Sequence, residues 1–313
     1  MAAARSVEPP QVGAYGAAGR SAWLDVEWSE HRRFVRVADR LLNVVELGDG
    51  PPLLFIHGLG GCWQNWLENL PELARDHRVI AVDLPGFCAS EMPAGAVSIT
   101  GYARLLDVLC EALAVDAAAV VGNSMGGFVA AELAINHPQR VERLVLVSAA
   151  GLQIAELRLE RALQRLQRLR RLERAFSRCG GFVAARSEIV ARRARLRRIV
   201  PAGVAAHPAL LPGPLVAEQV AGARPGFMPA VRAMAGYPLR DRLAQIACPT
   251  LIVWGARDRV VPVRDAFAFE QLIGAARRIV YPDTGHLPML ERPARFNADL
   301  RAFLGETPAT ATG

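Results

Sequence analysis

The sequence contains no lysine, because all 37 residues counted as lysine or arginine are arginines. This absence excludes two classes of chemistry. A Schiff base to a substrate or to pyridoxal phosphate requires a lysine amine, and the phosphate-binding P-loop requires a lysine beside the nucleotide. The function of the chain therefore has to rest on other groups.

Cysteine is scarce as well, with five residues that are never spaced as C-x-x-C. An odd number at scattered positions supports neither a disulfide framework nor a zinc site. We expect reduced thiols that pack as small core residues, and we expect no metal. The five residues are Cys62, Cys88, Cys110, Cys179 and Cys248.

Long hydrophobic runs are also missing. No stretch reaches the roughly 18 uninterrupted apolar residues of a membrane span. The first 20 residues contain alanine, glycine and proline but no continuous apolar segment of the kind found in a secretory signal. We expect a flexible N-terminal arm over residues 1–30 and a cytoplasmic location.

The chain is nevertheless rich in apolar residues, which make up 52% of it, against 21% charged residues. Short apolar runs alternate with segments of helical periodicity, and this pattern indicates βαβ units around a largely parallel sheet. Strands are predicted at 34–37, 41–47, 53–56, 79–82, 118–121, 141–147, 250–254 and 277–281, and helices at 99–113, 125–136, 264–273 and 294–304.

Residues 151–237 interrupt the alternation and contain no convincing strand. Leucines at three- and four-residue spacing predict an amphipathic helix in the first part of this segment, and proline and glycine become frequent in the second part. We interpret the segment as a helical lid inserted into one domain. The core then comprises 31–150 and 238–306, and 307–313 form a C-terminal tail.

The first part of the lid is strongly basic, with 14 arginines and four glutamates between Glu156 and Arg198. An arginine face of this kind favours either simple solvation, which we prefer, or weak contact with an anionic membrane surface. We expect no nucleic-acid partner, because few aromatic side chains that could stack on bases lie among these arginines.

The strongest motif is the string VGNSMGG from Val121 to Gly127, which places G-x-S-x-G between a buried strand and a helix. A serine hydroxyl is a weak nucleophile. It becomes useful when a sharp turn exposes it beside the N-terminal amides of a helix. We therefore predict that Ser124 is a nucleophile.

A second motif, HGLGG from His57 to Gly61, follows the predicted strand at 53–56. Such a glycine-rich turn can aim a backbone N–H at a carbonyl oxygen, and the residue after the nucleophile supplies a second donor. We assign an oxyanion hole to the amides of Leu59 and Met125. His57 is interpreted as a residue that orients the turn.

The base is predicted to be His286, which lies in the loop after the last strand. Four of the other five histidines lie in segments without another catalytic sign, and His57 belongs to the turn described above. A loop at the carboxyl end of the last strand can reach a nucleophile on a central strand.

The acid that orients this base is predicted to be Asp258, because it follows the strand at 250–254. Two other carboxylates are considered. Asp283 is close to His286 in sequence and is expected to shape the loop, whereas Asp265 begins a helix and suits a capping role.

Together these motifs resemble the α/β-hydrolase superfamily over about residues 34–304, apart from the lid. The segment from Val82 to Ser90 is similar to the D-x-P-G-x-G-x-S turn of that family, with Cys88 where glycine is usual and Asp83 as a turn residue. The resemblance implies an α/β fold with a mostly parallel, eight-stranded sheet flanked by helices. Serine at position 124 argues against members that use aspartate there, such as haloalkane dehalogenases and epoxide hydrolases.

The resemblance implies a serine hydrolase that cleaves carboxylic esters of apolar acyl or aromatic substrates and needs no cofactor. Three alternatives remain open: a C–C bond hydrolase of the meta-cleavage type, a cofactor-free haloperoxidase-like enzyme, and a weakly catalytic ligand receptor. Meta-cleavage enzymes commonly carry tryptophan soon after the catalytic histidine, whereas this chain has Leu287. The residues that select the substrate are not identifiable from the sequence.

Overall fold

A computed structural model describes residues 15–16, 19–152, 203–220, 224–235 and 237–306. Its centre is an eight-stranded sheet in the order β1-β2-β4-β3-β5-β6-β7-β8. The pairs β1·β2 and β2·β4 are antiparallel and every other pair is parallel, which confirms the predicted fold class. The strands are β1 Arg32–Val37, β2 Arg40–Leu47, β3 Pro52–Ile56, β4 Arg78–Val82, β5 Ala118–Asn123, β6 Val141–Val147, β7 Thr250–Gly255 and β8 Ala276–Tyr281.

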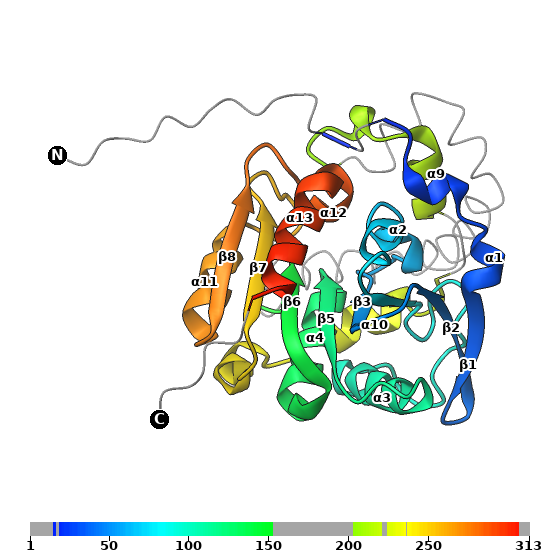
Figure 1. Cartoon of the computed structure of the whole chain (residues 1–313). Coiled ribbons are helices and arrows are strands. Elements are labelled where there is room, and N and C mark those ends of the chain that lie inside the picture. Colours follow the sequence, from blue (N-terminus) through cyan, green and yellow to red (C-terminus); the bar gives the residue numbers. More distant parts are fainter. Residues whose placement is uncertain (1–14, 17–18, 153–202, 221–223, 236, 307–313) are drawn as a thin grey trace, which may run out of the picture.

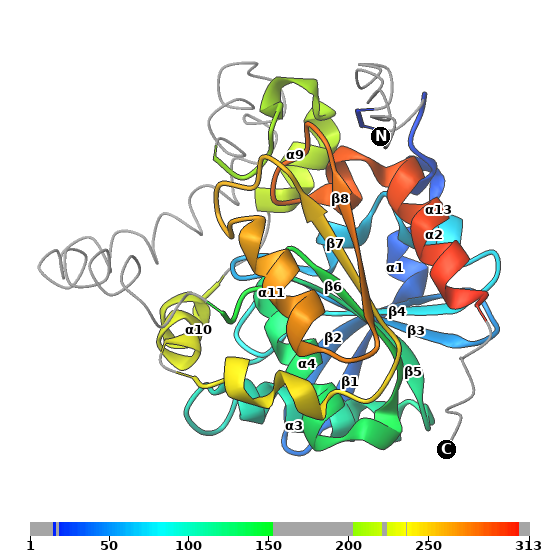
Figure 2. The same ribbon diagram turned by 90° about the vertical axis from the view of Figure 1, so that its left-hand side faces the viewer.

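Helices cover both faces of the sheet (Figures 1 and 2). On one face, α3 (Ile99–Ala112), α4 (Met125–Asn136) and α11 (Arg264–Leu272) pack against the sheet, and on the other face α2 (Leu70–Leu73) and α13 (Pro293–Leu304) do so. Alternation along β3 divides its side chains between the two layers. Leu54 and Ile56 belong to one apolar cluster, and Leu53 and Phe55 belong to the other. A strand that is apolar at successive positions is therefore buried on both faces.

The parallel strands end at one edge of the sheet, and the turns that follow them lie together there. Ile56 pairs with Gly122 on the adjacent strand, so the turns after β3 and β5 leave the sheet at the same level. At the far end of this edge Gly255 of β7 pairs with Tyr281 of β8. In open α/β sheets, ligands bind beyond these carboxyl ends.

Two helices of the segment interpreted as a lid are described, α9 (Gly213–Val220) and α10 (Phe227–Met234). In Figure 1, α9 lies beyond the carboxyl edge of the sheet, whereas α10 lies at the level of the sheet and contacts α3. The arginine-rich amphipathic helix that the sequence predicts falls within 153–202 and lies outside the described residues, so its contact with a membrane surface stays a prediction. Among the described helices, none combines the length and the apolar character needed to cross a bilayer.

Part of the N-terminal arm packs against the folded domain. Trp23 lies in a short 3-10 helix, Ala22–Asp25, and is 7% exposed. Tyr15 is also buried and shares an apolar cluster with Ala205, Leu211 and Val216 of the lid. A further short helix, α1 (Trp28–His31), leads from the arm into β1.

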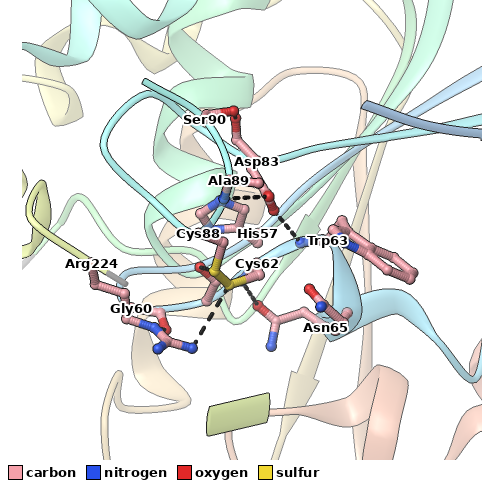
Figure 3. Close-up of a disulfide and its surroundings, with 12 residues drawn as sticks. His57, Gly60, Cys62, Trp63, Asn65, Asp83, Cys88, Ala89, Ser90 and Arg224 are labelled. Atoms are coloured by element: carbon pink, nitrogen blue, oxygen red, sulfur yellow. Dashed lines mark hydrogen bonds between the residues drawn. A yellow bond between two sulfur atoms is a disulfide. The ribbon is translucent and has the colours of Figure 1, made fainter. Parts of the chain in front are cut away.

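The expectation of reduced cysteines is wrong for one pair, because Cys62 and Cys88 form a disulfide (Figure 3). The two residues are 26 positions apart, and this spacing does not indicate a pair. They meet because β3 and β4 are neighbours in the sheet, so the turns after these strands lie together. Cys88 has a positive φ of 50°, which explains why glycine is usual at this position. Disulfides persist mainly in oxidising compartments, so the pair gives no support to a cytoplasmic location.

The expectation holds for two other cysteines, Cys110 and Cys248, which are free. Burial raises the pKa of Cys110 to about 11 and that of Cys248 to about 11, which keeps both thiols protonated and unreactive at neutral pH. Cys179 lies outside the described residues.

Peptide mapping tests the pairing directly. When the protein is denatured in iodoacetamide without a reductant, we expect Cys62 and Cys88 to stay unlabelled in linked peptides. Cys110 and Cys248 serve as internal controls and become alkylated in the same sample. Alkylation of all four residues before reduction would contradict the disulfide.

Candidate active site

Ser124 stands alone between the end of β5 and the start of α4. Its backbone has φ 55° and ψ −116°, a conformation that L-amino acids rarely adopt. Hydrogen bonds hold it there. The Ser124 N–H donates to Val147 O at 2.9 Å, and the N–H of Ala150 donates to Ser124 O at 2.9 Å. The predicted sharp strand-turn-helix elbow is therefore present.

Two glycines make the elbow possible because other backbone segments cross it closely. A Cβ on Gly122 would lie 2.3 Å from Gly126 O, and a Cβ on Gly126 would lie 2.2 Å from Ile56 O. Real Cβ atoms do not approach backbone oxygens so closely, so both positions of the G-x-S-x-G motif require glycine.

The glycine-rich turn after β3 runs beside this elbow. A Cβ on Gly58 would lie 3.1 Å from the Cβ of Ser124. The next residue, Leu59, has an amide that donates to no backbone or side-chain atom within the described ranges. Met125 is the first residue of α4, and the first N–H groups of a helix have no partner inside that helix. Two amides without internal acceptors thus flank the serine.

His57 joins the turn after β3 to the turn after β4, as expected of a residue that orients the turn. It is fully buried, and its Nε2 accepts a hydrogen bond from the Leu84 N–H at 2.9 Å. The proton must then be on Nδ1, which donates to Gly58 O at 2.7 Å. Burial lowers the pKa of His57 from 6.5 to about 4, so the ring is neutral at physiological pH.

His286 and Asp258 lie together, although 28 residues separate them in sequence. The Nδ1 of His286 is 2.8 Å from Oδ2 of Asp258. Neither side chain is more than 6% exposed. The other carboxylate oxygen, Oδ1 of Asp258, accepts the N–H groups of Val260 and Val261 at 2.8 and 2.9 Å. Because Nδ1 is committed to the carboxylate, Nε2 is the ring nitrogen left to act on a reacting group.

The loop that carries His286 also contacts the elbow. The side-chain amide of Asn123, which precedes the serine, donates to His286 O at 3.3 Å and to Val147 O at 3.1 Å. Asn123 is 2% exposed. The sequence analysis did not single out this residue, although its place beside the nucleophile is a signal that could have identified it.

The rival carboxylates lie elsewhere, as expected. Asp283 forms ion pairs with His207 at 2.8 Å and with Arg257 at 2.6 Å, and so shapes the loop before His286. Asp265 lies in the first turn of α11. Asp83 follows β4, and its carboxylate accepts the N–H of Trp63 at 2.8 Å. It therefore links the turns after β3 and β4, as expected of a turn residue.

The lid contacts the glycine-rich turn through two residues. The Arg224 guanidinium donates to Gly60 O and lies beside the disulfide, 3.7 Å from Cys62 Sγ (Figure 3). The ring of Phe227 on α10 lies 3.2 Å from where a Cβ on Gly60 would be. An apolar side chain of α10 therefore packs against Gly60, the residue after Leu59.

The buried His57 predicts a specific pH dependence of stability. Its folded pKa is depressed, so its contribution is fully present above pH 6.5 and is lost as the pH falls through 6.5 towards 4, because only the unfolded chain takes up the proton. Between about pH 7.5 and about pH 5 this loss amounts to on the order of 2 kcal/mol. Urea unfolding at both pH values measures it, and His57→Gln should show a smaller decrease. An equal decrease in both proteins would contradict the assignment.

Comparisons with known proteins agree with this architecture. The family described as alpha/beta hydrolase fold matches residues 51–293. A 2-hydroxymuconate semialdehyde hydrolase of Pseudomonas sp. (strain CF600) is 32% identical over 289 residues, covering 86% of this chain and 92% of that protein. A solved membrane phospholipase A is 28% identical with a TM-score of 0.70 and covers 90% of each chain. A thermophilic esterase from Thermogutta terrifontis is 25% identical with a TM-score of 0.67, covering 87% of this chain and 97% of that one. The chain therefore belongs to the α/β-hydrolase fold family and is a hydrolase of that fold.

Proposed function

We propose that this chain is a serine hydrolase that cleaves carboxylic esters of apolar acyl or aromatic substrates through an acyl-enzyme on Ser124. The observation that supports it most is the Asp258–His286 hydrogen bond in a loop joined to the elbow of Ser124 through Asn123. A base that a carboxylate orients is the group that makes a serine hydroxyl nucleophilic at neutral pH.

In the first half of the reaction, Oγ of Ser124 attacks the ester carbonyl while Nε2 of His286 takes the hydroxyl proton. The carbonyl oxygen becomes an oxyanion, which the amides of Leu59 and Met125 stabilise. The C–O bond to the alcohol then breaks, and the imidazolium returns its proton to the leaving alcohol. Asp258 stays ionised throughout and stabilises the charged ring.

In the second half, water attacks the acyl-enzyme. His286 takes a proton from this water, the same two amides bind the second oxyanion, and the proton passes to Oγ of Ser124 as the carboxylic acid leaves. No step needs a metal or an organic cofactor. A single group therefore serves as base and as acid in turn.

The apolar substrate preference is proposed from the lid. Leu59 and Phe227 are partly buried and pack against the same apolar cluster, next to the turn that carries the proposed oxyanion hole. On α10, Ala230, Val231 and Met234 are buried as well. An acyl chain that lies against such side chains gains from each methylene removed from water.

A second candidate is hydrolysis of a C–C bond. It is favoured by the relative at 32% identity, a 2-hydroxymuconate semialdehyde hydrolase that matches over most of its own length. Against it stands Leu287 directly after His286, where enzymes of the meta-cleavage type commonly carry tryptophan nearby. On the ground of Leu287 we favour the ester.

Substitution of the triad tests the mechanism. Ser124→Ala should abolish turnover of p-nitrophenyl butyrate. Asp258→Asn should lower kcat by about 10³- to 10⁴-fold, because an amide in place of the carboxylate favours the wrong tautomer of His286. Asp265→Asn is the matched control, since it changes another buried carboxylate, in the first turn of α11, to which the mechanism gives no role, and kcat should stay within about twofold of wild type. Near wild-type kcat in Asp258→Asn would show that another group orients the base.

Substrate preference is tested with a series of p-nitrophenyl esters from acetyl to dodecanoyl. We expect kcat/KM to rise about tenfold from the acetyl to the butyryl ester, because each buried methylene contributes about 0.8 kcal/mol. 2-Hydroxymuconate semialdehyde is assayed in parallel. A much higher kcat/KM for this substrate would favour the C–C hydrolase, and a single burst without turnover on any ester would favour a receptor.

A further inference from the structure

Glu291 is a buried carboxylate for which the proposed mechanism has no use. It is the last residue of the short helix α12 (Pro288–Glu291) and has no exposed surface. Burying a carboxylate costs several kcal/mol unless hydrogen bonds replace the lost water. The groups around Glu291 therefore have to supply hydrogen bonds to its carboxylate.

Two of these groups are the amides on either side of the proposed base. The Gly285 N–H donates to Oε2 of Glu291 at 2.8 Å, and the Leu287 N–H donates to Oε1 at 3.1 Å. One carboxylate thus binds the N–H groups of the residues before and after His286. Holding both neighbours restricts the backbone at His286 and with it the direction in which the imidazole leaves the backbone.

The backbone of His286 itself is held from other directions. Its N–H donates to Val204 O at 2.7 Å, and its carbonyl accepts from the Asn123 side chain at 3.3 Å. The loop is also packed tightly, because a Cβ on Gly285 would lie 2.6 Å from Ala206 N. A loop after an edge strand would otherwise be among the more mobile parts of the fold.

A further donor to Glu291 comes from the N-terminal arm. The hydroxyl of Tyr15 donates to Oε2 at 2.7 Å and accepts the His207 N–H at 3.0 Å. The Ala206 N–H donates to the same Oε2 at 2.9 Å. Burial and the neighbouring Glu291 raise the pKa of Tyr15, so its hydroxyl keeps its proton and remains a donor.

From these contacts we infer that Glu291 is a positioning residue for His286. Tyr15, in the N-terminal arm, supports it by donating a hydrogen bond to its carboxylate. The inference rests on the proposed role of His286 as base. Glu291 touches neither substrate nor imidazole and acts only through the backbone of the loop. A displacement of a reacting group by about 1 Å can cost about 10²-fold in rate, so a loosened loop should impair the chemical step.

Glu291→Gln tests this role with little change in volume. The glutamine keeps one oxygen as an acceptor, but its NH₂ group cannot accept the amide hydrogens that the other oxygen binds. We expect kcat for p-nitrophenyl butyrate to fall by about 10- to 100-fold, with KM within about threefold of wild type. Tyr15→Phe leaves the carboxylate in place and should produce a smaller fall in kcat.

The matched control is Glu132→Gln. Glu132 on α4 is equally buried and binds Arg242 at 2.7 Å. Its other hydrogen-bond partners are Thr100, Asn136 and Tyr237, none of which lies in the His286 loop. We expect this variant to lose thermal stability while kcat stays within about twofold of wild type. If Glu291→Gln likewise loses stability with unchanged kcat, Glu291 is only structural and the inference is overturned.

A second readout needs no substrate and so separates this inference from the proposed function. The Nδ1 proton of His286, which is bonded to Asp258, should give a low-field proton NMR signal in wild type, and that signal should broaden or vanish in Glu291→Gln. An unchanged signal would overturn the inference whether or not the protein cleaves esters. If Glu291→Gln does not fold, the same two measurements are made on Tyr15→Phe. An unchanged NMR signal together with unchanged kcat in Tyr15→Phe would overturn the inference.

Discussion

The hydrogen bond between His286 and Asp258 is the interaction on which the proposed function depends. Their side chains are 2.8 Å apart and almost completely buried. An imidazole can act as a base at a chosen atom only when its other nitrogen is committed, and Asp258 provides that commitment. The amides of Val260 and Val261 in turn hold the carboxylate of Asp258. The backbone after β7 therefore determines the orientation of the imidazole through Asp258.

Ser124 is also held in its orientation by the backbone around it. Its positive φ persists because Gly122 and Gly126 let neighbouring segments approach within distances that no side chain would allow. Strain of this kind costs on the order of 1–3 kcal/mol and is retained where surrounding structure over-determines it. The Ser124 elbow and the His286 loop meet through Asn123, so the nucleophile and the proposed base are held in one hydrogen-bonded unit.

The fold and the parts of the site that follow strands could be predicted from the sequence, because apolar runs identify strands and parallel strands end at one edge. Ser124 and His286 were proposed in this way. The Cys62–Cys88 disulfide could not, since it depends on which strands are neighbours and not on spacing. Glu291 was missed for a similar reason: its partner Tyr15 is 276 residues away, and the periodicity of the sequence does not reveal that the two are buried together.

The most direct test of the account is covalent labelling of the nucleophile. After reaction with a fluorophosphonate, intact-mass and peptide mass spectrometry should show one adduct per chain, located on Ser124, because only an activated serine reacts readily with such a reagent. Removing the base in His286→Ala should abolish the labelling while the protein remains folded. An adduct on another residue, or equal labelling with and without the imidazole, would contradict the central claim that the His286–Asp258 pair activates Ser124.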